Sequence, residues 1–135
     1  MNYDKELLRD IYWSFNNEQY DSQKDFEAAL TEYYKLISGD NIPIQFDKIV
    51  INSPKVVIQY MKYNYDEEDW DEPQVLFEAG NENGFTAGEL LYKIHKDIGK
   101  ELEGEDNVFF EGLTFATIDD PDFPKIPVYF LDTGS

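Results

Sequence analysis

The chain has one histidine, no cysteine and a large excess of carboxylates, and an active site would have to be built from these side chains. His95 lies in a predicted helix beside Ile94, with Leu91 and Ile98 near it, and no serine stands in a nucleophile-elbow context. A catalytic triad therefore lacks partners. Carboxylate pairs suited to glycoside chemistry carry no information, because 29 acidic residues always supply some pair. We predict that the protein is not an enzyme.

Metal and phosphate sites also lack their usual residue patterns. The acidic runs 66–72 and 119–122 offer oxygen ligands for Ca²⁺, but they lack the alternating ligands and the fixed glycine of an EF-hand. One histidine without cysteine does not make a structural zinc site. Segment 80–84 precedes a predicted helix, where an anion could bind, but it has no Gly-Lys-Ser/Thr sequence and contains Glu82. We predict no metal ion and no cofactor.

The most unusual surface segment is 63–72, which consists almost entirely of aromatic and acidic residues. Tyr and Trp dominate binding energy at protein interfaces, and surrounding carboxylates attract a basic partner. A solvated loop that only keeps the protein soluble has no local need for the indole of Trp70. Exposure of Trp70 would therefore favour binding, and burial would favour an ordinary loop. The predicted partner-binding residues are Tyr63, Tyr65, Asp66, Glu67, Glu68, Asp69, Trp70, Asp71 and Glu72.

A predicted helix and strand in the second half of the chain form the centre of the expected fold. Thr86 and Glu89 have the spacing of a capping box, and the apolar residues that follow recur at helical intervals until Gly104, which is expected to end the helix. Residues 108–115 have the aromatic content typical of a strand. A helix that leads into such a strand is expected to pack onto the sheet.

Two further helices are predicted near the N-terminus. Apolar residues recur at helical spacing over 7–15, and the two asparagines at 16–17 offer a stop. Ser22 is expected to cap a second helix whose apolar face covers 26–37 and which Gly39 ends. The short polar connection favours an antiparallel helical hairpin.

The remaining apolar segments are predicted strands. Segments 46–52 and 55–65 are expected to form a hairpin, 74–79 a third strand, and 126–131 the last one. Pro127 indicates that the last strand lies at an edge or begins irregularly. The element order ααβββαββ predicts the α+β class, with a mostly antiparallel sheet covered by helices on one side.

Charge and length narrow the possible partners and compartments. The formal net charge is −18 at pH 7, which disfavours nucleic acid and anionic membranes and favours a basic protein partner. A length of 135 residues with 41% hydrophobic residues predicts one domain over 1–135. The chain begins with no basic and apolar leader, lacks cysteine and has no apolar run of bilayer length, so we predict a cytoplasmic location.

Residues 84–95 (Gly-Phe-Thr-Ala-Gly-Glu-Leu-Leu-Tyr-Lys-Ile-His), followed by 108–113 (Val-Phe-Phe-Glu-Gly-Leu), resemble a segment of small bacterial immunity proteins. These proteins belong to polymorphic toxin and contact-dependent inhibition systems. The group is diverse in fold, so the resemblance implies a role more than a structure. It carries no chemical role to any residue of this chain.

The sequence therefore predicts an acidic, non-enzymatic protein-binding module, specifically an immunity protein that blocks the active site of a toxin such as a basic nuclease. Carboxylates would stand where substrate phosphates bind, with Trp70, Tyr63 and Tyr65 as apolar anchors. One alternative is a DNA mimic, which needs carboxylates spread along an elongated face. Another is an acidic adaptor with a different partner. A small carboxylate enzyme would require a cleft near Glu111 or His95 with acids of separated pKa values.

Overall fold

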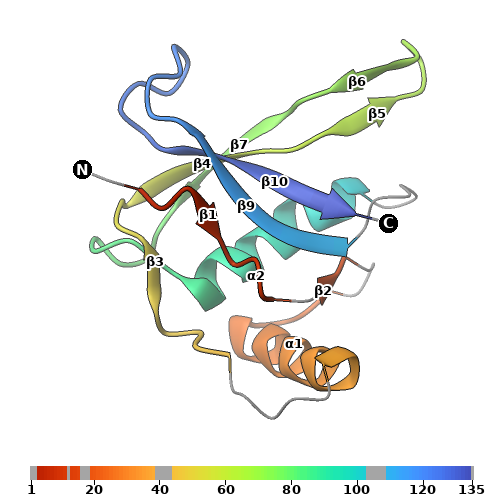
Figure 1. Cartoon of the computed structure of the whole chain (residues 1–135), viewed down its shortest axis with the longest axis vertical. Helices are drawn as coiled ribbons and strands as arrows, with labels where there is room; N and C mark the ends of the chain where they lie inside the picture. The colour runs from red at the N-terminus through yellow and green to blue at the C-terminus, as the bar shows by residue number, and fades with distance from the viewer. Residues whose placement is uncertain (1–2, 12, 16–18, 39–43, 103–108, 135) are drawn as a thin grey trace.

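A computed structural model of the chain describes residues 3–11, 13–15, 19–38, 44–102 and 109–134. Its helices and strands follow one another as shown in Figure 1. In chain order they are β1 (Glu6–Leu7), β2 (Trp13–Ser14), α1 (Gln23–Ser38), β3 (Ile49–Ile51), β4 (Lys55–Gln59), β5 (Lys62–Asn64), β6 (Asp69–Asp71), β7 (Gln74–Glu78), β8 (Phe85–Thr86), α2 (Ala87–Asp97), the 3₁₀ helix η1 (Gly99–Leu102), β9 (Phe109–Thr117) and β10 (Val128–Gly134).

Among the described residues, the largest sheet has six strands in the order β1-β9-β10-β4-β7, with β2 also paired to β9. Within the described residues, β10 and β4 run parallel and the other pairs of this sheet are antiparallel. The prediction of an α+β fold with a mostly antiparallel sheet is confirmed. The predicted order ααβββαββ is wrong, because two short strands precede the first helix.

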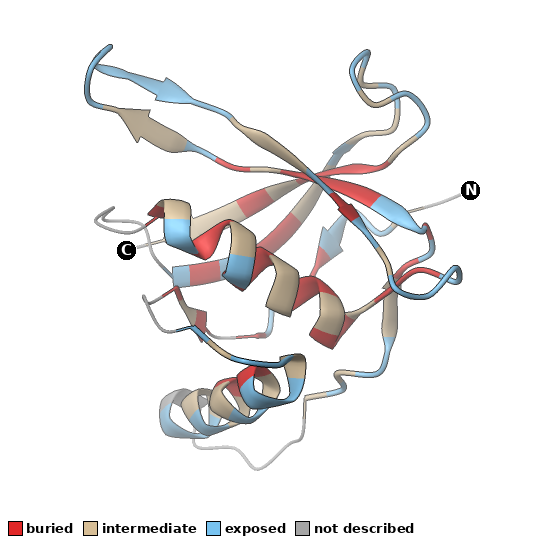
Figure 2. Cartoon of the chain, turned by 180° about the vertical axis from the view of Figure 1, so that it is seen from behind, coloured by how far each residue is buried: buried red, intermediate tan, exposed pale blue. Residues whose placement is uncertain are grey.

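Helix α2 packs across one face of this sheet, and α1 lies beyond it, in contact with α2 and β2 (Figure 1). Leu90 and Ile94 of α2 are fully buried. Val56, Leu113 and Leu131 of the sheet are at most 2% exposed. Figure 2 shows buried residues gathered where α2 meets the strands. Burial of each such side chain contributes roughly 1.5–3 kcal/mol. No helix in the described part of the chain combines the length and apolar character needed to cross a membrane.

The predicted helix over 7–15 is wrong, because this segment pairs with β9 instead. Leu7 of β1 lies opposite Leu113, and Trp13 of β2 lies opposite Phe110. These pairs give the segment backbone partners and side-chain packing that an isolated short helix would lack. Long-range pairing therefore overrides the local helical pattern.

The burial of the same segment follows a strand period that the helical pattern obscured. Ile11, Trp13 and Phe15 are buried at every second position. Leu8, with φ of 59°, redirects the chain after β1. The predicted stop at 16–17 lies outside the described residues.

The second predicted helix is confirmed as α1. The hydroxyl of Ser22 accepts a hydrogen bond from the amide of Asp25 at 3.2 Å, which is the expected N-cap. Phe26 and Leu30 on its apolar face are fully buried. Gly39 lies outside the described residues. Because the first helix is absent, the predicted helical hairpin is wrong, and α1 packs on α2.

The predicted capping of α2 is half right. Thr86 Oγ1 accepts from the amide of Glu89 at 3.1 Å, as predicted. The Glu89 carboxylate instead accepts from the amide of Gly80 at 2.8 Å, so it ties the preceding turn to the helix. The α-helix ends at Asp97, earlier than predicted, and η1 continues the chain. Gly104 lies outside the described residues.

The predicted hairpin of 46–52 with 55–65 is wrong. β3 pairs with β8, and β4 pairs with β7 and β10. Ser53 Oγ bonds to both the amide and the carbonyl oxygen of Lys55 and shapes the backbone between β3 and β4. The predicted strand over 74–79 is confirmed as β7.

The last predicted strand is present but is not at an edge. β10 lies between β9 and β4 inside the sheet. Pro127 precedes the strand, and its carbonyl accepts from the amide of Val57 at 3.0 Å. The register with β9 shifts between Val128 and Tyr129, so the alternative of an irregular beginning is the correct one.

Candidate functional site

The predicted partner-binding residues occupy the outer half of one long β-hairpin. Its inner half is β4 with β7, its outer half is β5 with β6, and the amide of Tyr60 donates to the carbonyl of Pro73 at 3.1 Å between them. One register runs unbroken through the pairs Lys55↔Glu78, Gln59↔Gln74, Lys62↔Asp71, Tyr63↔Trp70 and Asn64↔Asp69. We call residues 62–72 the arm, and Figure 1 shows it projecting from the body of the molecule. The acidic segment between the predicted strands 55–65 and 74–79 is therefore not simply a solvated loop, because Asp69–Asp71 form a strand.

Three aromatic rings pack together on the arm. Tyr63 lies opposite Trp70, with ring centroids 5.2 Å apart and the planes at 72°. Tyr65 meets Tyr63 edge-on at 4.9 Å. A cross-strand aromatic pair such as Tyr63–Trp70 contributes up to about 1 kcal/mol to hairpin stability. The rings therefore help to hold the two strands of this acidic segment together.

The tip of the arm is closed by an asparagine. The side-chain oxygen of Asn64 accepts from the amides of Asp66 and Glu67, at 3.0 and 3.2 Å. Glu68 has a positive φ of 54°, which lets the chain reverse into β6. Asn64 is a residue type that favours turns, but the high charge of the segment drew attention away from this signal.

The aromatic rings remain accessible despite their mutual packing. Trp70 is 48% exposed and Tyr65 is 71% exposed. Tyr63 is half-buried, and the carboxylate-bearing residues from Asp66 to Glu72 are exposed. The condition that favoured binding over an ordinary loop, an exposed Trp70, is met.

The opposite face of the arm is polar and fixes the arm to the body. Lys62 Nζ lies 2.8 Å from the Glu101 carboxylate on η1. The hydrogen bond from Lys62, followed by its positive charge, lowers the pKa of Glu101 below the ordinary value of 4.5. Asn64 donates to the Asp71 carboxylate at 3.2 Å. Side chains alternate between the two faces of a strand, so the aromatic face is left for other contacts.

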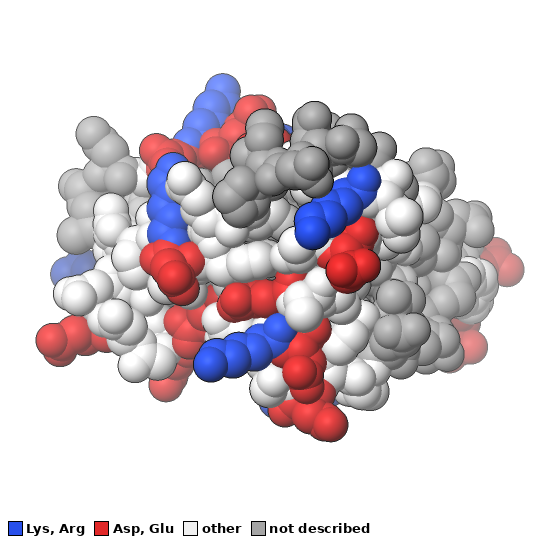
Figure 3. Space-filling view, turned by 90° about the horizontal axis from the view of Figure 1, so that it is seen from below, with Lys and Arg blue, Asp and Glu red and all other residues white. Residues whose placement is uncertain are grey.

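The charge around the arm differs from that on the side of the molecule where α1 lies. There, basic side chains stand among carboxylates, so opposite charges are close neighbours (Figure 3). In the arm, Lys62 is the basic residue, and Glu101 pairs with it. The carboxylates of 66–69 are thus concentrated at the tip.

Trp70 also lines a hollow of about 450 Å³ between the arm and the sheet. Met61 and Phe130 supply further apolar surface, and Glu111 and Asp132 supply carboxylates. The sequence alone does not connect these residues, because they come from strands far apart along the chain. The structure brings them together through the pairing of β10 with β9 and β4.

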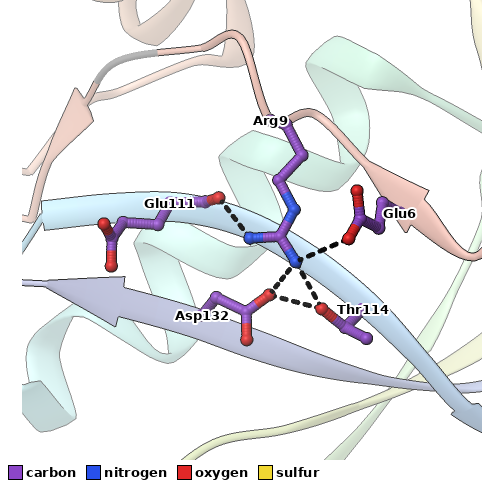
Figure 4. Close-up of polar contacts among 5 residues, drawn as sticks. All are labelled: Glu6, Arg9, Glu111, Thr114 and Asp132. Carbon is purple, nitrogen blue, oxygen red and sulfur yellow. Dashed lines mark hydrogen bonds and ion pairs between the residues drawn. The ribbon is translucent and has the colours of Figure 1, made fainter.

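Arg9 organises the polar side of this hollow (Figure 4). Its Nη1 donates to the carbonyl oxygen of Glu111 at 2.9 Å. Its Nη2 lies 2.5 Å from Thr114 Oγ1 and 2.8 Å from an oxygen of Asp132, which also accepts from Thr114 at 2.6 Å. Figure 4 shows the Glu111 carboxylate pointing away from the guanidinium. The guanidinium thus offsets Asp132 but leaves the Glu111 carboxylate out of its reach.

Comparison of this chain with models of known families, with curated proteins and with solved structures finds no match.

His95, the other residue singled out from the sequence, belongs to the core. It is 5% exposed, and its Nδ1 accepts a hydrogen bond from Trp13 Nε1 at 3.1 Å. This bond assigns the ring proton of a neutral imidazole to Nε2. The rings of Phe15, Tyr20 and Phe26 surround it, with centroids 5.1 to 6.2 Å away. The geometry gives His95 a packing and hydrogen-bonding role.

A second hollow, of about 480 Å³, lies between the N-terminal segment and β3. Asp4, Glu6, Asp10 and Lys48 line it together with apolar residues. Within the described residues, no three His, Asp or Glu side chains are placed to hold a metal ion. The arm therefore has the strongest set of features for binding a partner.

Proposed function

We propose that this chain is a non-enzymatic module that binds a basic protein partner through the arm. We further infer that the partner is a toxin domain such as a nuclease, whose active site the arm blocks, in the manner of the immunity proteins that residues 84–95 and 108–113 resemble. The observation that carries the proposal is the half-exposed indole of Trp70 on a projecting, hydrogen-bonded hairpin among carboxylates.

The aromatic face of the arm supplies binding energy in this proposal. A tryptophan side chain buries 150–250 Å² when fully enclosed, so covering the exposed 48% of Trp70 removes on the order of 100 Å² from water. At about 25 cal/mol per Å², this contributes roughly 2–3 kcal/mol. The hairpin already has its backbone hydrogen bonds, so little conformational entropy is lost on docking.

The carboxylates supply attraction and position. A nuclease is basic along the groove that holds substrate phosphates, and a partner of charge −18 is drawn to that groove before contact forms. The carboxylates at the tip would occupy the positions of phosphates. The rings behind them would then seal the groove against substrate.

The first experiment tests the purified chain for capture of the products of neighbouring genes, and measures its association with a captured basic domain at increasing NaCl concentrations. We expect the association rate constant to fall about tenfold or more between low and high salt, as electrostatic steering requires. An association rate constant indifferent to ionic strength would remove the electrostatic part of the proposal.

Two variants of equal charge locate the site. The arm variant neutralises carboxylates for which the structure gives no hydrogen bond or ion pair, and the control neutralises exposed carboxylates elsewhere. The arm variant carries Asp66→Asn, Glu67→Gln, Glu68→Gln and Glu72→Gln. The control carries Asp21→Asn, Glu32→Gln, Glu82→Gln and Asp119→Asn. We expect much slower association for the arm variant than for the control.

Trp70→Ala tests the anchor separately. Its loss should weaken the complex by about 2 kcal/mol, mainly through faster dissociation. If the arm variant combined with Trp70→Ala still folds and inhibits the toxin like the unchanged chain, the arm is not the binding site. Equal slowing by the arm variant and the control would show that net charge alone acts.

A further inference from the structure

The hollow beneath the arm has an apolar wall and a separate wall of charged side chains. It lies where the arm meets β9 and β10, and Trp70, Met61 and Phe130 contribute its apolar wall. Met61 is 42% exposed and Trp70 48% exposed, so both are accessible from solvent. Arg9 lies across β9 and β10 with α2 behind them, on the uncovered side of the sheet (Figure 4). A partner that docks on the aromatic face of the arm would therefore meet this hollow.

We propose that this hollow receives an arginine side chain of the partner protein. The inference rests on the proposed function, because it names the group by which the partner enters the surface beside the arm. The guanidinium would lie against the indole of Trp70, its aliphatic stem would contact Met61 and Phe130, and Glu111 would accept its hydrogen bonds.

The charges of the hollow select a cation. Arg9 already uses its two terminal nitrogens, on the Glu111 carbonyl and on Thr114 with Asp132. The Glu111 carboxylate is turned away from Arg9 and lies above Gly134, where an added Cβ would come within 2.6 Å of its oxygen. No ion pair to this carboxylate is present among the described residues. Glu111 and Asp132 together outweigh Arg9, so the hollow has an excess of negative charge.

The shape of the apolar wall favours arginine over lysine or an aromatic side chain. A guanidinium is planar, stacks on an indole and bonds a carboxylate with two parallel donors, whereas an ammonium is a compact, strongly hydrated charge. The arginine stem also covers apolar surface while its head stays polar. An aromatic side chain would leave the Glu111 carboxylate without a partner.

The test uses the full chain alone, with the indole N–H signals of Trp13 and Trp70 followed by NMR. The probe is N-acetyl-arginine amide, with N-acetyl-lysine amide and the uncharged N-acetyl-citrulline amide as matched controls at constant ionic strength. We expect the Trp70 signal to shift saturably with the arginine probe, with a Kd of about 1–10 mM for so small a ligand. The lysine probe should bind more weakly, the citrulline probe should leave the Trp70 signal unchanged, and the Trp13 signal should stay in place.

Variants identify the carboxylate that matters. Glu111→Gln should weaken arginine binding about threefold, the scale of one solvent-exposed charge pair, whereas Glu32→Gln on α1 should not change it. The proposal is overturned if the arginine probe gives no saturable shift, if citrulline shifts the signal equally, or if Glu111→Gln binds as the unchanged chain does. Because no partner is used, such a failure leaves the arm proposal standing. Conversely, arginine binding without toxin binding would contradict only the proposed function.

Discussion

Replacing either member of the buried Trp13–His95 pair should destabilise the protein strongly. Trp13 is 4% exposed and His95 5%, and the 3.1 Å hydrogen bond between them joins β2 to α2. In His95→Leu the indole N–H of Trp13 loses its acceptor in the core. In Trp13→Phe the Nδ1 of His95 loses its donor.

The magnitude follows from the cost of a buried polar group without a partner. A buried donor left unsatisfied costs about 1–3 kcal/mol. Loss of the ring contacts of His95 with Trp13 and Phe26, at 5.5 and 5.1 Å, adds about 0.5–1.5 kcal/mol each. Leucine restores most of the apolar volume, so we expect His95→Leu to lower the free energy of unfolding by about 2–4 kcal/mol. Against a typical total of about 5–15 kcal/mol, this is a large fraction.

A double-mutant cycle isolates the hydrogen bond. The doubly substituted protein leaves neither group of the pair unsatisfied, so its loss should be smaller than the sum of the single losses by about 1 kcal/mol or more. Urea unfolding should be followed by far-UV circular dichroism, because Trp13→Phe removes one of the two indoles. Trp70→Phe on the arm serves as the control and should be additive with His95→Leu. If the stability loss of the double variant equals the sum of the two single losses to within about 0.3–0.5 kcal/mol, the Trp13–His95 hydrogen bond makes no contribution of its own.

Two further predictions concern the backbone and the titration of a buried phenol. Gly84→Ala should destabilise by ~3 kcal/mol or more, because φ is +126° there and the added Cβ would lie 2.0 Å from the Ile51 carbonyl oxygen. Gly80→Ala, whose Cβ would meet only the flexible Glu89 carboxylate at 3.2 Å, is the matched control and should cost at most about 1 kcal/mol in urea unfolding. Burial is the main cause that raises the pKa of Tyr129, and the negative charge of Asp4 is the next. The neutral phenol is therefore favoured in the folded state. The stabilisation that this gives is present below pH 10 and is lost as the pH rises above 10. Tyr129→Phe, which also removes the 2.7 Å hydrogen bond to the Asp4 carbonyl, should lower stability by about 1 kcal/mol at neutral pH and flatten its decline above pH 10; an unchanged slope would contradict this assignment.

Local signals predicted the elements whose stability is local. The Ser22 cap and the apolar face that follows it gave α1, and Thr86 gave the start of α2, because a cap and a helical stripe lie within a few residues of each other. The third strand, over 74–79, was also predicted, because its sequence has the period of a strand.

Elements that depend on distant partners were missed. Residues 7–15 fit both a helix and a strand, and pairing with β9 about a hundred residues later decides between them. The strands β3 and β4 are neighbours in sequence but not in any sheet, because each finds its partner further along the chain. Periodicity identifies a strand but does not name its neighbour.

The composition of the sequence identified the candidate site but did not predict its secondary structure. The density of rings and carboxylates in 63–72 marked the segment, yet the charge suggested a loop where the chain forms the paired strands of the arm. Arg9 was not connected with Asp132 or Thr114, since that contact exists only once β9 and β10 are side by side. The hollow is accordingly a property of the assembled sheet.

The unbroken register of the long hairpin has a mechanical consequence. A pull on the outer turn is carried along the two backbones into β4, which is clamped between β7 and β10 in the interior of the sheet. The arm is thus anchored in the hydrophobic core through β4, where Val56, Val57 and Ile58 are fully buried. A force on a partner bound at the tip of the arm would therefore be resisted by the packing of the central sheet.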